Sequence, residues 1–183
     1  MEDLPLVEIY TDGACIGNPG PGGFAAVLLF EDKRKEVSGG YRLTTNNRME
    51  IMAAIAGLSV LKRKCAVNIY SDSRLLVDAM TKGWVQSWKK RGWRKADGKP
   101  ALNSDLWEKL LSLTLIHEAG FYWIRGHTGD EENEICDRLS KHAAAGDNLM
   151  VDEVYEKKKT VENNRIKNLT EGEGRWKRVQ KNY

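Results

Sequence analysis

The first third of the chain contains three strand-like segments in close succession, and no helical periodicity interrupts them. Residues 6–11 and 35–43 flank the continuous apolar run GFAAVLLF at residues 23–30, and the charged turn EDKR joins the second segment to the third. Strands connected by such short links pair antiparallel. The chain is therefore expected to begin as a three-stranded antiparallel meander, onto which all later elements must pack.

Helical and strand-like patterns alternate in the rest of the chain. Two further short strands are expected at residues 66–71 and 121–124. Apolar side chains recur with helical spacing in the first of the later helices. The helices are expected at residues 47–62, 73–80, 84–90, 103–117 and 133–145. Three antiparallel strands followed by this alternation predict an α/β fold with a five-stranded mixed sheet and helices on both faces.

Basic residues are concentrated in two segments, although the net charge is only +3. Residues 82–99 carry +6 and residues 156–183 carry +5, so the remainder carries −8. Such segregation indicates a polyanion held by basic segments around an acidic centre. We assign residues 1–155 to one domain and residues 156–183 to a basic tail. The sequence leaves open whether this tail binds the polyanion or is a solvated, partly disordered extension.

Several observations bear on the cellular compartment. No apolar run approaches the roughly 20 residues that a membrane span needs. The acidic, short N-terminal segment MEDLPLVEIY is not typical of a signal or transit peptide. The cysteines, Cys15, Cys65 and Cys136, are odd in number and lack a CxxC pair. This favours a reducing compartment over a disulfide scaffold or structural zinc. We expect a cytoplasmic protein without membrane contact.

Four acidic residues occupy the ends of predicted elements. Asp12 follows the first strand and Asp72 follows the fourth, while Glu50 lies in the first turn of a helix and Asp137 in the last helix. If the first and fourth strands are parallel neighbours, Asp12 and Asp72 emerge at the same edge of the sheet, where open α/β sheets bind ligands.

Each acid also has a purely structural interpretation. These are a turn at Asp12-Gly13, a capping box of Asn47 with Glu50, an N-cap at Asp72 and an ion pair of Asp137 with Lys141. Four converging acids, however, would repel one another unless cations compensate them. Oxygen ligands without a His/Cys set favour Mg²⁺ or Mn²⁺ over zinc. Two such ions about 4 Å apart stabilise the attacking and leaving oxygens in phosphodiester cleavage.

Five colinear motifs between residues 5 and 155 resemble those of type 1 ribonucleases H, in particular the stand-alone bacterial enzymes. They are YTDGACIGNPGPGG, TTNNRMEIMAAI, YSDS, WKKRGW and GHTGDEENEICDRL. The resemblance implies a ribonuclease H-like fold with three antiparallel strands and then two parallel ones. It also implies that residues 1–155 form a monomeric catalytic domain with a basic protrusion at about residues 82–99. The expected activity is metal-dependent cleavage of the RNA strand of RNA–DNA hybrids to 5′-phosphate and 3′-hydroxyl ends.

The resemblance also implies roles for individual residues. Asp12 bridges two Mg²⁺ ions, for which Mn²⁺ could substitute. Asp137 completes one site, and Glu50 with Asp72 completes the other. His127 matches a loop histidine that assists proton transfer or product release. His117 and His142 match no functional position and are expected to be structural.

A further set of residues matches family positions that contact the hybrid. Backbone groups of Ala14 and Cys15 are expected to approach the RNA 2′-hydroxyls, which distinguish RNA from DNA. Arg74 departs from the glutamine that bacterial relatives often carry. Side-chain contacts are expected from Asn18, Thr45, Asn46, Asn47, Arg74, Trp84, Lys89, Lys90, Arg91 and Trp93. Thr45 matches a pocket for a DNA-strand phosphate, and the last five belong to the basic protrusion.

Two alternative functions remain for such a chain. One is a module that binds hybrids without cutting them, against which the complete set of four acids speaks. The other is a different nuclease of the same fold, such as a junction resolvase or an integrase core. The basic protrusion and the GNPGPGG segment argue against this second alternative.

Overall fold

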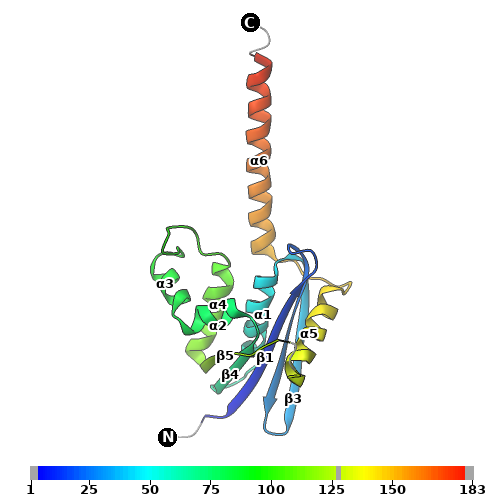
Figure 1. The fold of residues 1–183 in the computed structure, drawn as a ribbon, viewed down its shortest axis with the longest axis vertical. Helices are drawn as coiled ribbons and strands as arrows, with labels where there is room; N and C mark the ends of the chain where they lie inside the picture. The colour runs from blue at the N-terminus through cyan, green and yellow to red at the C-terminus, as the bar shows by residue number, and fades with distance from the viewer. Residues whose placement is uncertain (1–3, 127–128, 180–183) are drawn as a thin grey trace.

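A computed structural model describes residues 4–126 and 129–179, with side chains up to residue 166. Five strands form one mixed sheet in the order β3-β2-β1-β4-β5 (Figure 1). The strands are β1 Leu6–Cys15, β2 Gly20–Phe30, β3 Lys33–Thr44, β4 Ala66–Ser71 and β5 Glu118–Trp123. Strand β2 pairs antiparallel with β1 and β3, whereas β4 runs parallel to β1 and β5. The predicted five-stranded mixed sheet, with three antiparallel strands followed by two parallel ones, is confirmed.

Helices cover both faces of the sheet, as predicted. They are α1 Asn46–Ser59, α2 Arg74–Thr81, α3 Trp84–Lys90, α4 Ser104–Ile116, α5 Glu131–Ala144 and α6 Glu153–Val179. Figure 1 shows α5 on one face and α1 to α4 on the other. The main apolar core lies between α1, α4 and the sheet, with Trp107 and Ile55 fully buried in it. On the opposite face, Cys136 of α5 packs against Ala25 and Val27.

The glycine-rich segment after the first strand is itself part of the sheet. Strand β1 continues to Cys15 and pairs with β2, so that Asp12 lies opposite Ala25. The prediction that Asp12 ends the strand in a turn is therefore wrong. A Cβ atom at Gly23 would lie 2.1 Å from the carbonyl oxygen of Ser140, so the absence of side chains lets α5 lie directly on the paired backbone.

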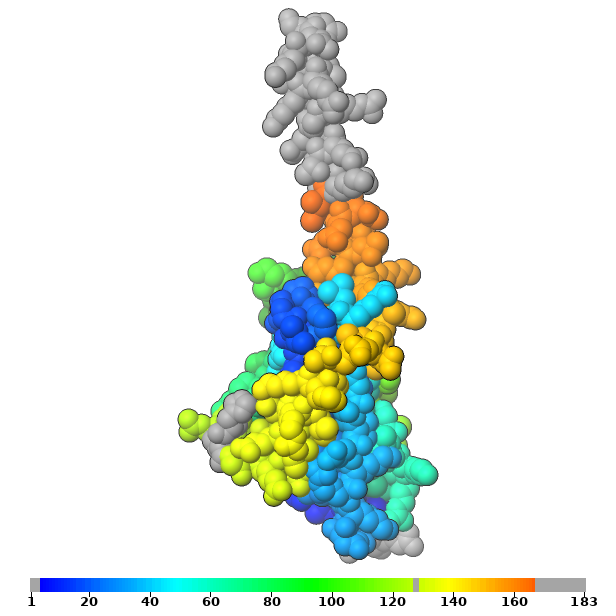
Figure 2. Space-filling view, turned by 90° about the vertical axis from the view of Figure 1, so that its right-hand side faces the viewer, coloured from blue at the N-terminus to red at the C-terminus, as the bar shows by residue number. Residues whose placement is uncertain are grey.

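The C-terminal segment forms the long helix α6, which begins at Glu153 and projects away from the globular body (Figures 1 and 2). Asp152 stabilises its start, because its carboxylate accepts a hydrogen bond from the backbone of Tyr155 at 3.3 Å. The sequence left the structure of this tail open; its described part, up to residue 179, is helical. None of the helices in the described residues is both long and apolar enough to span a bilayer.

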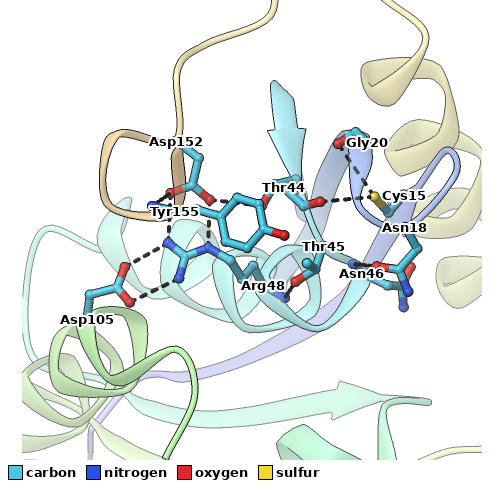
Figure 3. Close-up of polar contacts among 10 residues, drawn as sticks. All are labelled: Cys15, Asn18, Gly20, Thr44, Thr45, Asn46, Arg48, Asp105, Asp152 and Tyr155. Carbon is cyan, nitrogen blue, oxygen red and sulfur yellow. Dashed lines mark hydrogen bonds and ion pairs between the residues drawn. The ribbon is translucent and has the colours of Figure 1, made fainter. Parts of the chain in front are cut away.

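A buried arginine connects the base of α6 to the domain (Figure 3). Arg48 of α1 is only 3% exposed and forms bidentate ion pairs with Asp105 of α4 and with Asp152. Asp152 also accepts a hydrogen bond from Thr44 at 2.9 Å, and the Arg48 guanidinium lies 5.8 Å from the ring centre of Tyr155. The network therefore joins β3, α1, α4 and α6.

Candidate active site

The four acids predicted from the sequence line one cavity at the carboxyl edge of β1 and β4. The cavity has a volume of about 580 Å³, and Asp12, Glu50, Asp72 and Asp137 all contribute to its lining. The parallel register pairs Thr11 with Ser71, which places Asp12 beside Asp72. Residues from β1, α1, α5 and the end of β4 thus meet at one site, as expected from the positions of the elements.

Asp12 is the most buried of these acids, with an exposed fraction of 8%. Its Oδ2 accepts a hydrogen bond from Ser140 Oγ at 3.1 Å. Burial and the nearby charge of Asp72 raise the pKa of Asp12 to about 7. The folded protein therefore resists ionising this carboxylate, and a bound cation would relieve that resistance.

A close approach of α1 to β1 places Glu50 beside Asp12. A Cβ atom on Gly13 would lie 2.3 Å from the backbone nitrogen of Glu50 and 2.4 Å from the carbonyl carbon of Met49. Only glycine fits here, because both neighbours are backbone atoms that cannot move aside without shifting the helix.

Glu50 does not form the capping box that the sequence allowed. The N-cap of α1 is Thr45, whose side chain accepts from the backbone of Arg48, so Asn47 already lies inside the helix. The Glu50 carboxylate instead accepts hydrogen bonds from Asn46 Nδ2 at 2.8 Å and from Ser73 Oγ. Its pKa is raised, mainly by burial. These contacts orient the carboxylate toward the cavity rather than toward its own backbone.

Asp72 is likewise not the N-cap of the helix that follows it. Ser73 holds that position, because its Oγ accepts from the backbone of Leu76 at 3.3 Å. The Asp72 carbonyl oxygen accepts a hydrogen bond from Trp123 Nε1 at 3.1 Å. A Cβ atom on Gly126 would lie 2.5 Å from Asp72 Oδ2, so the chain after β5 passes directly over this carboxylate.

Asp137 does form the ion pair that was its structural alternative. Lys141 Nζ lies 2.8 Å from its carboxylate, one turn later on α5. Lys141 also lines the acid cavity, however, and its side chain is 61% exposed. The sequence indicates this lysine only as an ion-pair partner of Asp137, although its spacing of four residues on one helix also places it beside the site. It provides one positive charge among four acids.

Seven of the residues expected to contact nucleic acid lie in the acid cavity or in a neighbouring cavity. Ala14, Cys15 and Asn46 line the acid cavity, whereas Asn18, Thr45, Asn47 and Trp93 line the other. Figure 3 shows how the loop and helix are joined: Asn18 Oδ1 accepts from the backbone of Asn46, and Cys15 Sγ donates to Gly20 and Thr44 carbonyls. The two groups are therefore contiguous.

The tryptophans of the basic protrusion differ in their exposure. Trp88 packs against the buried ring of Trp107, while Trp84 is 38% exposed. Lys90 and Arg91 are exposed, but Lys89 forms an ion pair with Glu108 at 2.6 Å. Arg74 lies outside this segment, and its guanidinium is stacked 3.4 Å from the centre of the Trp123 ring. His127 falls outside the described residues.

The donor chemistry of the cavity fits hard divalent cations. Every acidic ligand offers carboxylate oxygens, which Mg²⁺ prefers. In the described part of the chain, no three carboxylate, imidazole or thiol groups lie close enough together to hold a metal ion unaided. Mg²⁺ commonly takes only one or two carboxylates and completes its shell with water and substrate phosphate oxygens. The four acids fit ions that are completed by such additional ligands.

This sheet, with acids at the carboxyl edge of β1 and β4, defines a protein of the ribonuclease H-like class. The family model for RNase H matches residues 5–145. The chain is 59% identical to the ribonuclease H of Rippkaea orientalis over 159 residues, which cover 86% of this chain and 98% of that relative. It is also 59% identical to the ribonuclease H of Syntrophus aciditrophicus over 149 residues, or 81% and 86% of the two chains.

Solved structures agree with this assignment. LC9-RNase H1, a type 1 RNase H with the type 2 active-site motif, has a TM-score of 0.70 and 32% identity, covering 78% of this chain and 74% of that one. LC11-RNase H1, solved in complex with an RNA/DNA hybrid, has a TM-score of 0.57 and 28% identity, covering 75% and 96%. The chain belongs to the ribonuclease H family, whose members are generally metal-dependent.

Proposed function

We propose that this protein is an endonuclease that hydrolyses the RNA strand of RNA–DNA hybrids and leaves 5′-phosphate and 3′-hydroxyl ends. The observation that carries this proposal is the convergence of four carboxylates from four separate elements on one cavity, in a chain of the ribonuclease H family. A module that only binds hybrids would not need this acidic cavity, which opposes a polyanionic ligand unless cations are bound.

Asp12, Glu50, Asp72 and Asp137 would hold two Mg²⁺ ions, with Mn²⁺ as a substitute. Asp12 would serve both ions, Asp137 one of them, and Glu50 with Asp72 the other. When bound, such ions supply Lewis-acid stabilisation of charge on the attacking and leaving oxygens.

Neighbouring residues keep the carboxylates in place. Ser140 fixes Asp12, and Ser73 with Asn46 fixes Glu50. Lys141 offsets part of the negative charge around Asp137. We assign proton transfer or product release to His127.

The surface around the cavity would bind the hybrid. The backbone of Ala14 and Cys15 lies in the acid cavity, where it can approach the 2′-hydroxyls of the RNA strand. The side chains of Thr45, Asn46 and Asn47 at the start of α1 lie in or next to this cavity. The exposed protrusion residues Trp84, Lys90 and Arg91 would bind the DNA strand. We propose that residues 1–155 act as a monomeric catalytic domain and that the protein works in the cytoplasm.

A substrate panel tests this function. Purified protein is incubated with end-labelled RNA–DNA hybrid, double-stranded RNA and double-stranded DNA, each with Mg²⁺ and with a chelator. Only the hybrid incubated with Mg²⁺ should be cut, and only in its RNA strand. Binding of the hybrid without cleavage would favour the non-catalytic module, and cleavage of double-stranded DNA would favour a different nuclease of this fold.

Removal of one charge from the acid cluster should stabilise the metal-free protein. The pKa of Asp12, about 7, lies above its ordinary value of 3.8, so the folded state binds more protons than the unfolded state between these pH values. The free energy of unfolding of the wild type therefore falls as the pH rises from about 4 to about 7. At pH 8 without metal, Asp12→Asn should melt at a higher temperature than the wild type, and the difference should vanish near pH 4.

Divalent metal should act against the stability advantage of Asp12→Asn over the wild type. Millimolar Mg²⁺ is expected to raise the melting temperature of the wild type, because the cation binds the folded acid cluster preferentially. Asp12→Asn should gain little, whereas Asp78→Asn, which removes an acid of α2 paired with Lys82 outside the cavity, should respond like the wild type. Equal Mg²⁺ shifts in all three proteins, measured by calorimetry, would remove the support for a metal site at Asp12.

A further inference from the structure

A second cavity, of about 730 Å³, lies between α6 and the segment that follows α3. Four parts of the chain line it: Asn18, the start of α1 with Thr45 and Asn47, residues 92–94 and 100–104, and the first turns of α6 with Lys158 and Lys159. Figure 1 shows α6 rising from the end of the domain where α1 begins, with the segment after α3 to one side. We call this cavity the tail groove.

The tail groove carries uncompensated positive charge on two sides. Its lining includes one carboxylate among the described residues, Glu162, which pairs with Lys159 at 3.0 Å. Lys158 of α6 and Arg94 of the opposite segment form no ion pair with any carboxylate in the part of the chain that the structure describes. Arg94 donates one Nη1 hydrogen bond to the Gly98 carbonyl at 2.9 Å, which leaves its other N–H groups available.

The other charged groups that line the groove are already paired. Arg48 at its base is occupied by Asp105 and Asp152. Asp105 interacts electrostatically with Lys158, but both of its oxygens accept hydrogen bonds from Arg48. The positive charge of Lys158 and Arg94 is therefore left for a ligand.

The tail groove adjoins the acid cavity at the start of α1. Asn46 lines the acid cavity, while its neighbours Thr45 and Asn47 line the tail groove. Hydroxyl and amide groups of this kind donate hydrogen bonds to phosphate oxygens and position a nucleic acid without reading its sequence. A strand that passes through the acid cavity could thus continue over the first turn of α1 toward α6.

We propose that the tail groove binds the sugar–phosphate backbone of the nucleic-acid substrate beyond the cleavage site, so that α6 is a substrate-binding element. This inference rests on the proposed function. The family model ends at residue 145, so α6 lies beyond the residues that it matches. The lining of the groove favours this ligand, because its cationic side chains can bind phosphates and Trp93 offers an aromatic surface on which a base can stack.

The salt dependence of binding tests the proposal. Affinity for a fluorescent RNA–DNA hybrid is measured by anisotropy in a chelator, which prevents cleavage, at salt concentrations from about 50 to about 200 mM. Each phosphate contact contributes about −0.9 to the slope of log affinity against log salt. The double variant Arg94→Gln/Lys158→Gln should therefore have a slope shallower by about 2. Over this range it should lose about 12-fold less affinity than the wild type.

A matched control distinguishes the loss of positive charge in the groove from the loss of positive charge elsewhere on the surface. Lys33→Gln removes an exposed lysine at the first residue of β3, whereas Thr44 is the last residue of that strand and lies near the groove. This variant should leave the slope within error of the wild type. An unchanged slope in a double variant that melts like the wild type would overturn the proposal. A change in slope for Lys33→Gln equal to the change per positive charge removed in the double variant would also overturn it. Failure of the wild type to cut hybrid with Mg²⁺ would instead contradict the proposed function, since the binding measurement involves no cleavage.

Discussion

Replacing Asp72 by Asn, or Glu50 by Gln, is expected to abolish cleavage of an RNA–DNA hybrid, with kcat lowered about 10³-fold or more. Each change removes a negative oxygen ligand of the proposed metal site. Metal ions contribute several kcal/mol of charge stabilisation in such reactions, and each 1.4 kcal/mol corresponds to about a factor of ten in rate. Single-turnover rates with saturating Mg²⁺ and labelled hybrid measure this loss.

The fold should tolerate both substitutions. The N-cap of α2 is Ser73, so Asp72 is not needed to start that helix. Glu50 accepts hydrogen bonds from Asn46 on Oε1 and from Ser73 on Oε2. In Gln, the amide oxygen can accept from Asn46 while the amide nitrogen donates to the Ser73 hydroxyl. Asp78→Asn, a control outside the cavity, should keep the wild-type rate. Near wild-type cleavage by either site variant would show that the metal-ligand assignment is wrong.

Asp152→Ala should produce the largest loss of stability among the variants considered. The change leaves the buried Arg48 with half of its ion pairs and removes the acceptors of Thr44 and Tyr155. Breaking a buried ion pair typically costs about 3–5 kcal/mol, because an uncompensated charge stays buried. For a domain of this size, that corresponds to a decrease in melting temperature of about 6–20 °C.

The exposed ion pair at the base of α6 provides the matched control. Arg42 and Glu156 lie 2.7 Å apart, but the Arg42 side chain is 59% exposed, and solvent-exposed pairs contribute little. Glu156→Gln should therefore leave the thermal midpoint almost unchanged. A similar midpoint for Asp152→Ala and Glu156→Gln would contradict the view that the buried network anchors α6 to the domain.

The sequence predicted the sheet because each strand carries a local signal. Both the short links between the first three strands and the apolar composition of β2 are local signals, which can be read from residues adjacent in the sequence. The convergence of the four acids was predictable for a related reason. Asp12 and Asp72 follow similar positions on parallel strands, and the observed register places them side by side.

The features that were not predicted depend on contacts between distant segments. Ion pairs of Arg48 with Asp105 and Asp152 join positions more than 50 residues apart, and no periodic pattern marks them. The N-caps at Thr45 and Ser73 were missed because several polar residues precede each helix, and packing selects among them. The extension of β1 past Asp12 depends on pairing with β2. The glycine-rich sequence by itself suggests a loop, and only this pairing makes it part of a strand.

The most direct test of the proposed activity uses a single strand with a few ribonucleotides between deoxyribonucleotides, annealed to complementary DNA. We expect cleavage only within the ribonucleotide segment, only with Mg²⁺ or Mn²⁺, and with 5′-phosphate and 3′-hydroxyl ends; Asp12→Asn should give no product. Cleavage in the deoxyribonucleotide segments, cleavage in a chelator, or product from Asp12→Asn at the wild-type rate would contradict it.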